Sequence, residues 1–139
     1  MRISKHSNEL PSKLLPRPRF LLSDLTAERD EVFDDANGDL AIGDLESAVT
    51  GYRRSVELDP EFFDGWHALG MALMKTGDIK AAIGAGLQAT TLKPNDLLAW
   101  TGLSQMYVQD QQIAEAELAK GNARILSLGG KVVKEAGGT

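Results

Sequence analysis

The chain repeats a set of residues at intervals of 34. Alanine stands at positions 48, 82 and 116, leucine at 58, 92 and 126, and Trp66 is followed by Trp100 at the same step. Pro60 and Pro94 obey it too. A fixed period of this length indicates one structural unit that recurs and stacks on its neighbours, because a single unit cannot bury its own apolar face. The sequence therefore predicts three stacked units.

Each unit contains two apolar stretches that are separated by helix-ending residues. Gly43-Asp44 and Gly77-Asp78 interrupt two units in the middle, and Asp59-Pro60 and Lys93-Pro94 end them. Glycine and proline in these places favour the ends of helices, and no stretch alternates as a strand would. We expect an all-α fold with helices at 26–42, 44–58, 63–76, 78–92, 97–110 and 112–127.

The second unit resembles the tetratricopeptide repeat, whose pattern is W-x₂-L-G-x₂-Y…A-x₃-F…P. The matching residues are Trp66, Leu69, Gly70, Leu73, Ala82 and Pro94. The third unit repeats Trp100, Leu103, Tyr107 and Ala116, and the first keeps Ala48, Tyr52 and Pro60. The resemblance implies a right-handed α-solenoid of three repeats, at 29–62, 63–96 and 97–130.

Two residues depart from that pattern at the position of its second aromatic residue. Gly86 occupies it in the second repeat and Lys120 in the third. Either a neighbouring Trp or Met fills the space at Gly86, or the smooth Ala- and Gly-rich helix face contacts another chain.

The distribution of charged residues and prolines sets the N-terminal segment apart from the repeats. Residues 1–22 hold five basic residues against Glu9, and residues 23–62 hold twelve acidic residues against three arginines. The first segment also has three prolines, which oppose ordered packing. We expect residues 1–25 to form a flexible basic arm, 26–130 the three-repeat domain and 131–139 a C-terminal tail. The acidic face of the first repeat would attract this arm or a basic partner.

Composition disfavours most other functions. A net charge of −5 and a pI near 5.0 oppose binding to nucleic-acid phosphates. The chain has no cysteine and two separated histidines, so we expect no metal, no cofactor and no catalysis. It has no run of eighteen apolar residues to span a membrane and no apolar secretion signal, so we expect a cytoplasmic protein.

One acidic stretch resembles a calcium-binding loop. Asp35, Asn37, Asp39 and Glu46 have the spacing of loop positions 1, 3, 5 and 12. Leu40 stands where the sharp turn requires glycine, and the stretch coincides with the first expected helix. A calcium-responsive adaptor is therefore kept as a lesser alternative.

The resemblance also implies which side chains face the concave groove of the solenoid. Chaperone-tail adaptors of this family use lysines and arginines there, and here Lys75 is the only basic residue of the set. We therefore expect an adaptor that binds an amphipathic helix or extended apolar segment of a partner protein with basic flanks. The expected binding residues are Asp30, Phe33, Asp34, Asn37, Asp64, His67, Met71, Met74, Lys75, Thr101, Gln105 and Val108.

The last repeat carries an apolar stripe. Leu118 and Ile125 stand where the first repeat has Thr50 and Glu57. Either the valines at 132 and 133 fold back onto this stripe, or another subunit covers it. The second case would make the chain a self-assembling structural subunit, a homo-oligomer that uses Leu118 and Ile125.

Overall fold

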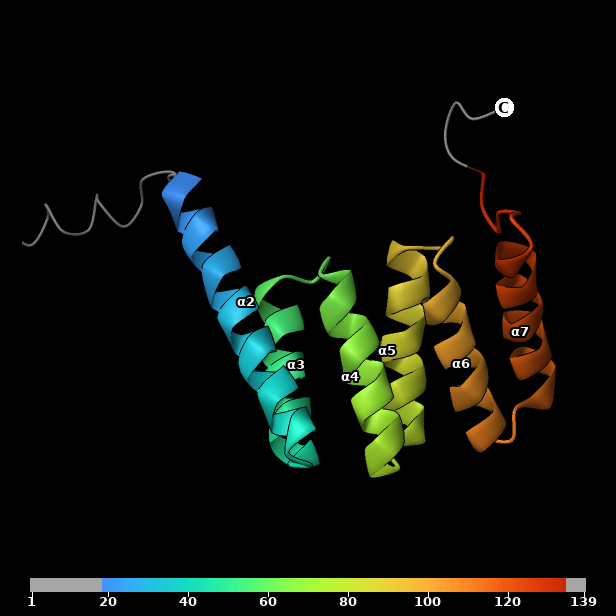
Figure 1. The fold of residues 1–139 in the computed structure, drawn as a ribbon, viewed down its shortest axis with the longest axis horizontal. Helices are drawn as coiled ribbons and strands as arrows, with labels where there is room; N and C mark the ends of the chain where they lie inside the picture. The colour runs from blue at the N-terminus through green and yellow to red at the C-terminus, as the bar shows by residue number, and fades with distance from the viewer. Residues whose placement is uncertain (1–18, 135–139) are drawn as a thin grey trace, which may run out of the picture.

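The computed structural model describes residues 19–134, and this part of the chain is a stack of six α-helices without strands (Figure 1). The all-α solenoid expected from the repeat is confirmed. The helices are α2 (Arg19–Ala41), α3 (Leu45–Leu58), α4 (Phe63–Thr76), α5 (Ile79–Leu92), α6 (Leu97–Gln109) and α7 (Ile113–Ser127).

The first helix is longer than expected. It begins at Arg19, so residues 19–25, which we assigned to the flexible arm, are helical. Pro18 is the last proline before Pro60. Proline has no backbone N–H and would break the hydrogen bonding of a helix interior. Because none follows until Pro60, a helix can run uninterrupted from residue 19. The rest of the expected arm, 1–18, and tail residues 135–139 lie outside the described residues.

Short turns join the helices within the first two pairs. Gly43 and Gly77 have φ angles of 85° and 91°, a backbone conformation that residues with a Cβ rarely adopt. The next residues, Asp44 and Asp78, each accept a hydrogen bond from the backbone N–H three residues later. Asp96 caps α6 in the same way. These side chains satisfy N–H groups that have no partner within the helix.

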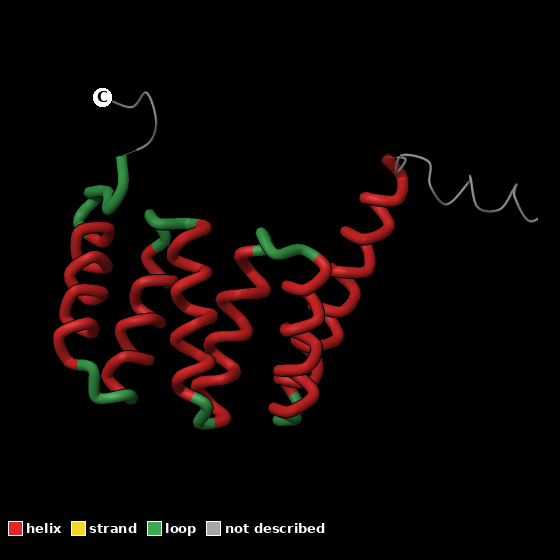
Figure 2. The backbone as a smooth tube through the Cα atoms, turned by 180° about the vertical axis from the view of Figure 1, so that it is seen from behind, coloured by secondary structure: helices red, strands yellow, loops and turns green. Residues whose placement is uncertain are grey.

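The helices pack as three antiparallel pairs: α2 with α3, α4 with α5 and α6 with α7 (Figures 1 and 2). Each pair also contacts the next, through α3 with α4 and through α5 with α6. In addition α4 contacts α6 directly. The first helices of the second and third pairs are therefore in contact as well. None of the described helices is long and apolar enough to cross a membrane.

The core repeats with the sequence. Ala48, Ala82 and Ala116 are all buried, and their small side chains let the paired helices approach closely. The indole N–H groups of Trp66 and Trp100 each donate to the carbonyl of the proline six residues earlier, both at 2.7 Å. Equivalent residues thus make equivalent contacts.

The space beside Gly86 is filled by Met106 of α6, which lies in van der Waals contact with it. Of the two readings of this glycine, a neighbouring methionine filling the gap is the one that the structure supports.

Candidate functional site

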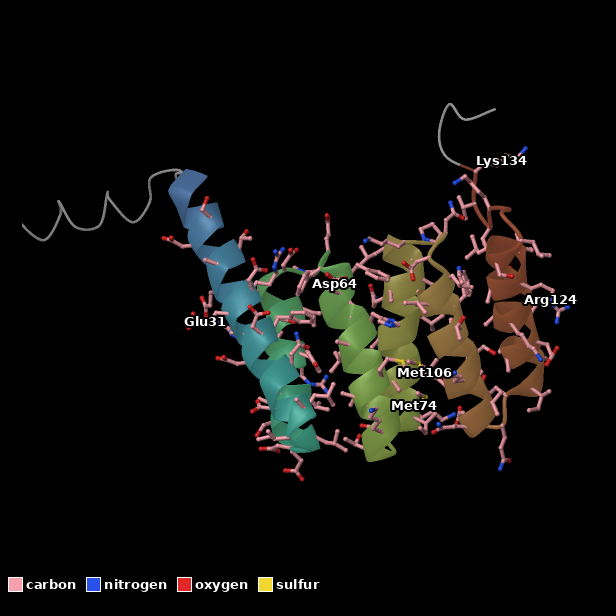
Figure 3. The ribbon with its side chains drawn as sticks, viewed as in Figure 1. Glu31, Asp64, Met74, Met106, Arg124 and Lys134 are labelled. Atoms are coloured by element: carbon pink, nitrogen blue, oxygen red, sulfur yellow. The ribbon has the colours of Figure 1, made fainter. Side chains whose placement is uncertain are left out.

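The residues expected to line the concave face lie on α2, α4 and α6, the first helices of the three pairs, and Asp64 and Met74 of this set are labelled in Figure 3. Seven of the twelve expected binding residues are exposed: Asp30, Asp34, Asn37, Asp64, Lys75, Gln105 and Val108. Five are half-buried: Phe33, His67, Met71, Met74 and Thr101. By exposure alone, the set thus divides into seven accessible side chains and five that are partly buried in the fold.

In the first pair, two expected binding residues hold the helices together. The Phe33 ring lies edge-on to Phe62, with ring centres 5.1 Å apart, and 5.5 Å from the ring of Tyr52. The Tyr52 hydroxyl donates to the side-chain oxygen of Asn37 at 2.6 Å. Burial, with Asp39 nearby, raises the pKa of Tyr52 and keeps this donor protonated. Phe33 and Asn37 therefore join α2 to α3.

Two of the expected binding residues on α2 are exposed acids. Asp34 is exposed, and Asp30 is exposed but accepts hydrogen bonds from Arg29, the shorter at 2.7 Å. Arg29 also binds Asp59 at 2.6 Å and lies 4.3 Å from the centre of the Phe62 ring. Asp34 is consequently the α2 carboxylate of the expected set that makes no such ion pair in the described part of the chain.

The middle pair supplies an aromatic and cationic cluster. The rings of Phe63 and His67 stack nearly parallel, at 5° and 5.9 Å between centres. The ammonium of Lys93 lies 4.6 Å from the centre of the Phe63 ring. Sequence reasoning missed Phe63 and Lys93. The signal that could have found them is an aromatic residue four positions before His67, on the same side of the helix.

Next to this cluster α4 and α6 cross closely. A Cβ placed on Gly102 would lie 3.2 Å from the Met71 sulfur and 3.7 Å from Cε1 of His67. Glycine at this crossing leaves room for both side chains. Met71 and His67, both in the expected binding set, thus lie at the contact between repeats, while Met74 lies one turn further along α4 (Figure 3).

In the last pair, three expected residues come together. Thr101, Gln105 and Val108 line a cavity of about 500 Å³ at the open end of the stack. We call it the end cavity. Its full lining is Thr101, Ser104, Gln105, Val108, Gln109, Glu117, Lys120 and Ala123.

The expected oligomer face stays largely exposed. Leu118 is 72% exposed and borders an apolar cavity of about 290 Å³ with Leu87 and Trp100. Ile125 is 44% exposed.

The valines expected to fold back are held elsewhere. The Asn95 side-chain oxygen accepts from the N–H groups of Val132 and Val133, at 2.9 and 3.0 Å. Its amide nitrogen donates to the Val133 carbonyl at 2.8 Å. The described tail is therefore bound to the turn between α5 and α6 and leaves Leu118 exposed.

The calcium-loop hypothesis does not fit the geometry. Asp35, Asn37 and Asp39 lie on the regular helix α2, which cannot wrap three ligands around one ion. Asn37 already accepts from Tyr52. Within residues 19–134 no group of three or more His, Cys, Asp or Glu side chains could hold a metal ion.

Comparison with known proteins gives one family and many solved structures. Residues 63–96 match the family described as tetratricopeptide repeat, over the same bounds as the second repeat unit. Among curated protein sequences none matches this chain.

The similar solved structures share the fold at low sequence identity. The TPR2B domain of yeast Sti1, in a complex with pHsp70, is 21% identical with a TM-score of 0.70, covering 73% of this chain and 81% of that one. The second TPR of Spaghetti (RPAP3), bound to the HSP90 peptide SRMEEVD, is 19% identical with a TM-score of 0.72, covering 76% and 97%. The type III secretion translocator chaperone SycD of Yersinia enterocolitica is 17% identical with a TM-score of 0.69, covering 74% and 78%.

Proposed function

We propose that this chain, whose residues 63–96 are a tetratricopeptide repeat and whose six helices form three such pairs, binds a segment of a partner protein on its concave face without catalysing a reaction. The fold supports this proposal. Two structures that share it, those of Sti1 and Spaghetti, hold pHsp70 and an HSP90 peptide.

The charge of the concave face favours a different partner from that peptide. Asp34 and Asp64 are exposed, and Lys75 is the only basic residue among the expected binding positions. The last four residues of SRMEEVD include three acidic ones. Acidic side chains beside Asp34 and Asp64 would repel one another, whereas lysine or arginine would be attracted. We therefore propose a partner segment with basic residues at its ends.

The middle of the face favours apolar side chains in that segment. Met71 and Met74 are half-buried, so each keeps part of its surface for a partner. A methionine side chain is flexible and polarisable and adapts to aliphatic or aromatic groups of several shapes. The stacked rings of Phe63 and His67 provide a flat surface beside them. Leucine or phenylalanine at the centre of the partner segment would fit this surface.

The test is binding of three labelled peptides, followed by fluorescence anisotropy. One has a leucine-rich centre with lysine and arginine at both ends, the second has the same centre with glutamate at both ends, and the third is SRMEEVD. We expect the first to bind and to weaken as salt rises, because the attraction is screened.

A pair of variants locates the binding. Asp34→Lys with Asp64→Lys reverses two concave charges and should abolish binding of the basic peptide. Glu46→Lys with Glu57→Lys makes the same change in net charge on α3, where both residues are exposed, and should retain most of it. Equal effects of the two pairs, or preferential binding of SRMEEVD, would contradict the proposal.

Self-association through the exposed apolar face around Leu118 and Ile125 of α7 is a second candidate. Its support is Leu118, which is 72% exposed over an apolar cavity. If this surface joins two copies, Leu118→Asp converts an oligomer into a monomer in analytical ultracentrifugation.

A further inference from the structure

Contacts between neighbouring repeats follow one register. At the second junction, a Cβ on Gly86 of α5 would lie 3.1 Å from Leu103 and 3.0 Å from Met106 of α6. At the first junction, a Cβ on Gly65 of α4 would lie 2.8 Å from Val56 of α3. The first helix of each repeat therefore packs onto the second half of the last helix of the preceding pair.

The outer face of α7, at the end of the stack, carries charged residues at positions that are uncharged in the internal junctions. A step of 34 residues takes Gly86 to Lys120, and two such steps take Val56 to Arg124. Gly86 and Val56 are buried beneath the next repeat, whereas Lys120 and Arg124 are exposed. Lys120 also lines the end cavity. The surface of α7 on which a further helix would dock therefore carries two basic residues, Lys120 and Arg124.

The opposite end of the stack carries acids at the matching positions. Two steps back, Leu103 corresponds to Asp35 of α2, and one step back Gly65 corresponds to Glu31. Both acids are exposed (Glu31 and Arg124 are labelled at the two ends of the stack in Figure 3). Gly38 corresponds to Met106, and a Cβ there would meet nothing within 4 Å. This face of α2 is therefore uncovered in the described structure.

We propose that α2 of a second copy docks on the end cavity, head to tail, and continues the solenoid. In that register Asp35 of the second copy faces Lys120, and Glu31 faces Arg124. Both matched positions bring opposite charges together, and this complementarity favours association in this register. Lys120, Arg124 and Glu31 are longer than Gly86, Val56 and Gly65 at the matching positions, so the copies lie farther apart than repeats within one chain.

The contact joins different surfaces of the two copies, so it leaves a free end on each assembly and permits further addition. Glu117 is the acidic residue that lines the end cavity, and it opposes the approach of α2. The association is therefore weak, and it is strongest at low salt. It does not depend on the proposed partner-binding function.

The test uses two double variants of the full chain in sedimentation velocity experiments at low salt. The head variant is Glu31→Lys with Asp35→Lys, and the tail variant is Lys120→Glu with Arg124→Glu. Each brings like charges together, so we expect each alone to remain monomeric while the unmodified chain sediments faster as its concentration rises. Self-association should weaken by about tenfold or more in each variant.

The mixture of the two variants gives the decisive result. The head variant keeps Lys120 and Arg124 for the tail variant's acids, and its new lysines face the tail variant's new glutamates. A mixture should therefore assemble although neither component does, which a folding defect cannot produce. Glu117→Gln should strengthen assembly of the unmodified chain, and Leu118→Asp should leave it unchanged.

Three results would overturn the proposal: an unmodified chain that is monomeric up to millimolar concentration, double variants that still assemble alone, or a mixture that stays monomeric. If Leu118→Asp is the only variant that loses assembly, the contact belongs instead to the exposed apolar face around Leu118.

Discussion

Met106 occupies the space into which a side chain at Gly86 would extend, with its sulfur 3.0 Å from the position of a Cβ on that glycine. One repeat earlier the sizes are reversed. Tyr52 stands at the position of Gly86 and Ala72 at that of Met106, and both are buried. The larger residue of each equivalent pair therefore stands on α3 at the first junction and on α6 at the second.

Met106→Ala should destabilise the chain by about 2–5 kcal/mol, since it leaves a cavity beside Gly86. Gly86→Leu alone should overfill the same space. Together they place the larger residue on α5 and the smaller one on α6, so the double variant should be more stable than the two single effects added together predict, with a coupling of about 1 kcal/mol or more. Urea denaturation gives all three values.

A matched control separates packing from helix propensity. Gly84 lies in the same helix, and a Cβ there would meet nothing within 4 Å. Gly84→Leu should therefore gain up to about 1 kcal/mol from propensity alone. Strictly additive effects of Gly86→Leu and Met106→Ala would show that the two positions do not share one space.

A second exchange links the start of each first helix to the end of its partner. Arg29 pairs with Asp59, and one repeat later Phe63 and Lys93 occupy the same positions and make a cation–π contact. Asp59→Lys alone should destabilise by roughly 0.5–1 kcal/mol, because it places two cations together. Adding Arg29→Phe should recover much of that loss. If the double variant is as unstable as Asp59→Lys, the two pairs are not interchangeable.

The sequence predicted the helix pairs well because their signals are local. Gly77 followed by Asp78 ends one helix and caps the next, and the structure shows both features. The start of α2 was predicted too late because residues 19–25 follow three prolines and were grouped with that basic segment, although four of the seven are apolar. The concave set could be predicted only by position. Position does not reveal that Phe33 and Asn37 are engaged with α3, since that depends on where Tyr52 points.

Stability at low pH should depend on Asp110. Hydrogen bonds from Lys80, and then from Gln112, hold the pKa of this carboxyl below its ordinary value. The folded chain thus favours the ionised form, so its stabilising effect is present above the ordinary aspartate pKa of about 3.9 and is lost as pH falls through the lower folded value.

Asp110→Asn should reduce the slope of unfolding free energy against pH between roughly pH 4 and pH 2. Lys80→Met should reduce it partly, because Gln112 still donates to the carboxylate. Asp44, whose pKa is lowered by its hydrogen bonds with Ser47, keeps some pH dependence in both variants. A slope unchanged in Asp110→Asn would show that the contact with Lys80 is absent in solution.

The order of the tail should depend on one side chain. Asn95 makes three hydrogen bonds with the backbone of Val132 and Val133, and it is the only described residue outside the tail that does so through its side chain. Asn95→Leu removes all three, so the amides of both valines should exchange with solvent hydrogen faster, while amides within α5 keep their rates. Asn95→Asp keeps both acceptor contacts and loses the donor, so its exchange rates should lie between those of the unmodified chain and those of Asn95→Leu. Equal rates in all three would mean that the tail is held by something other than this amide.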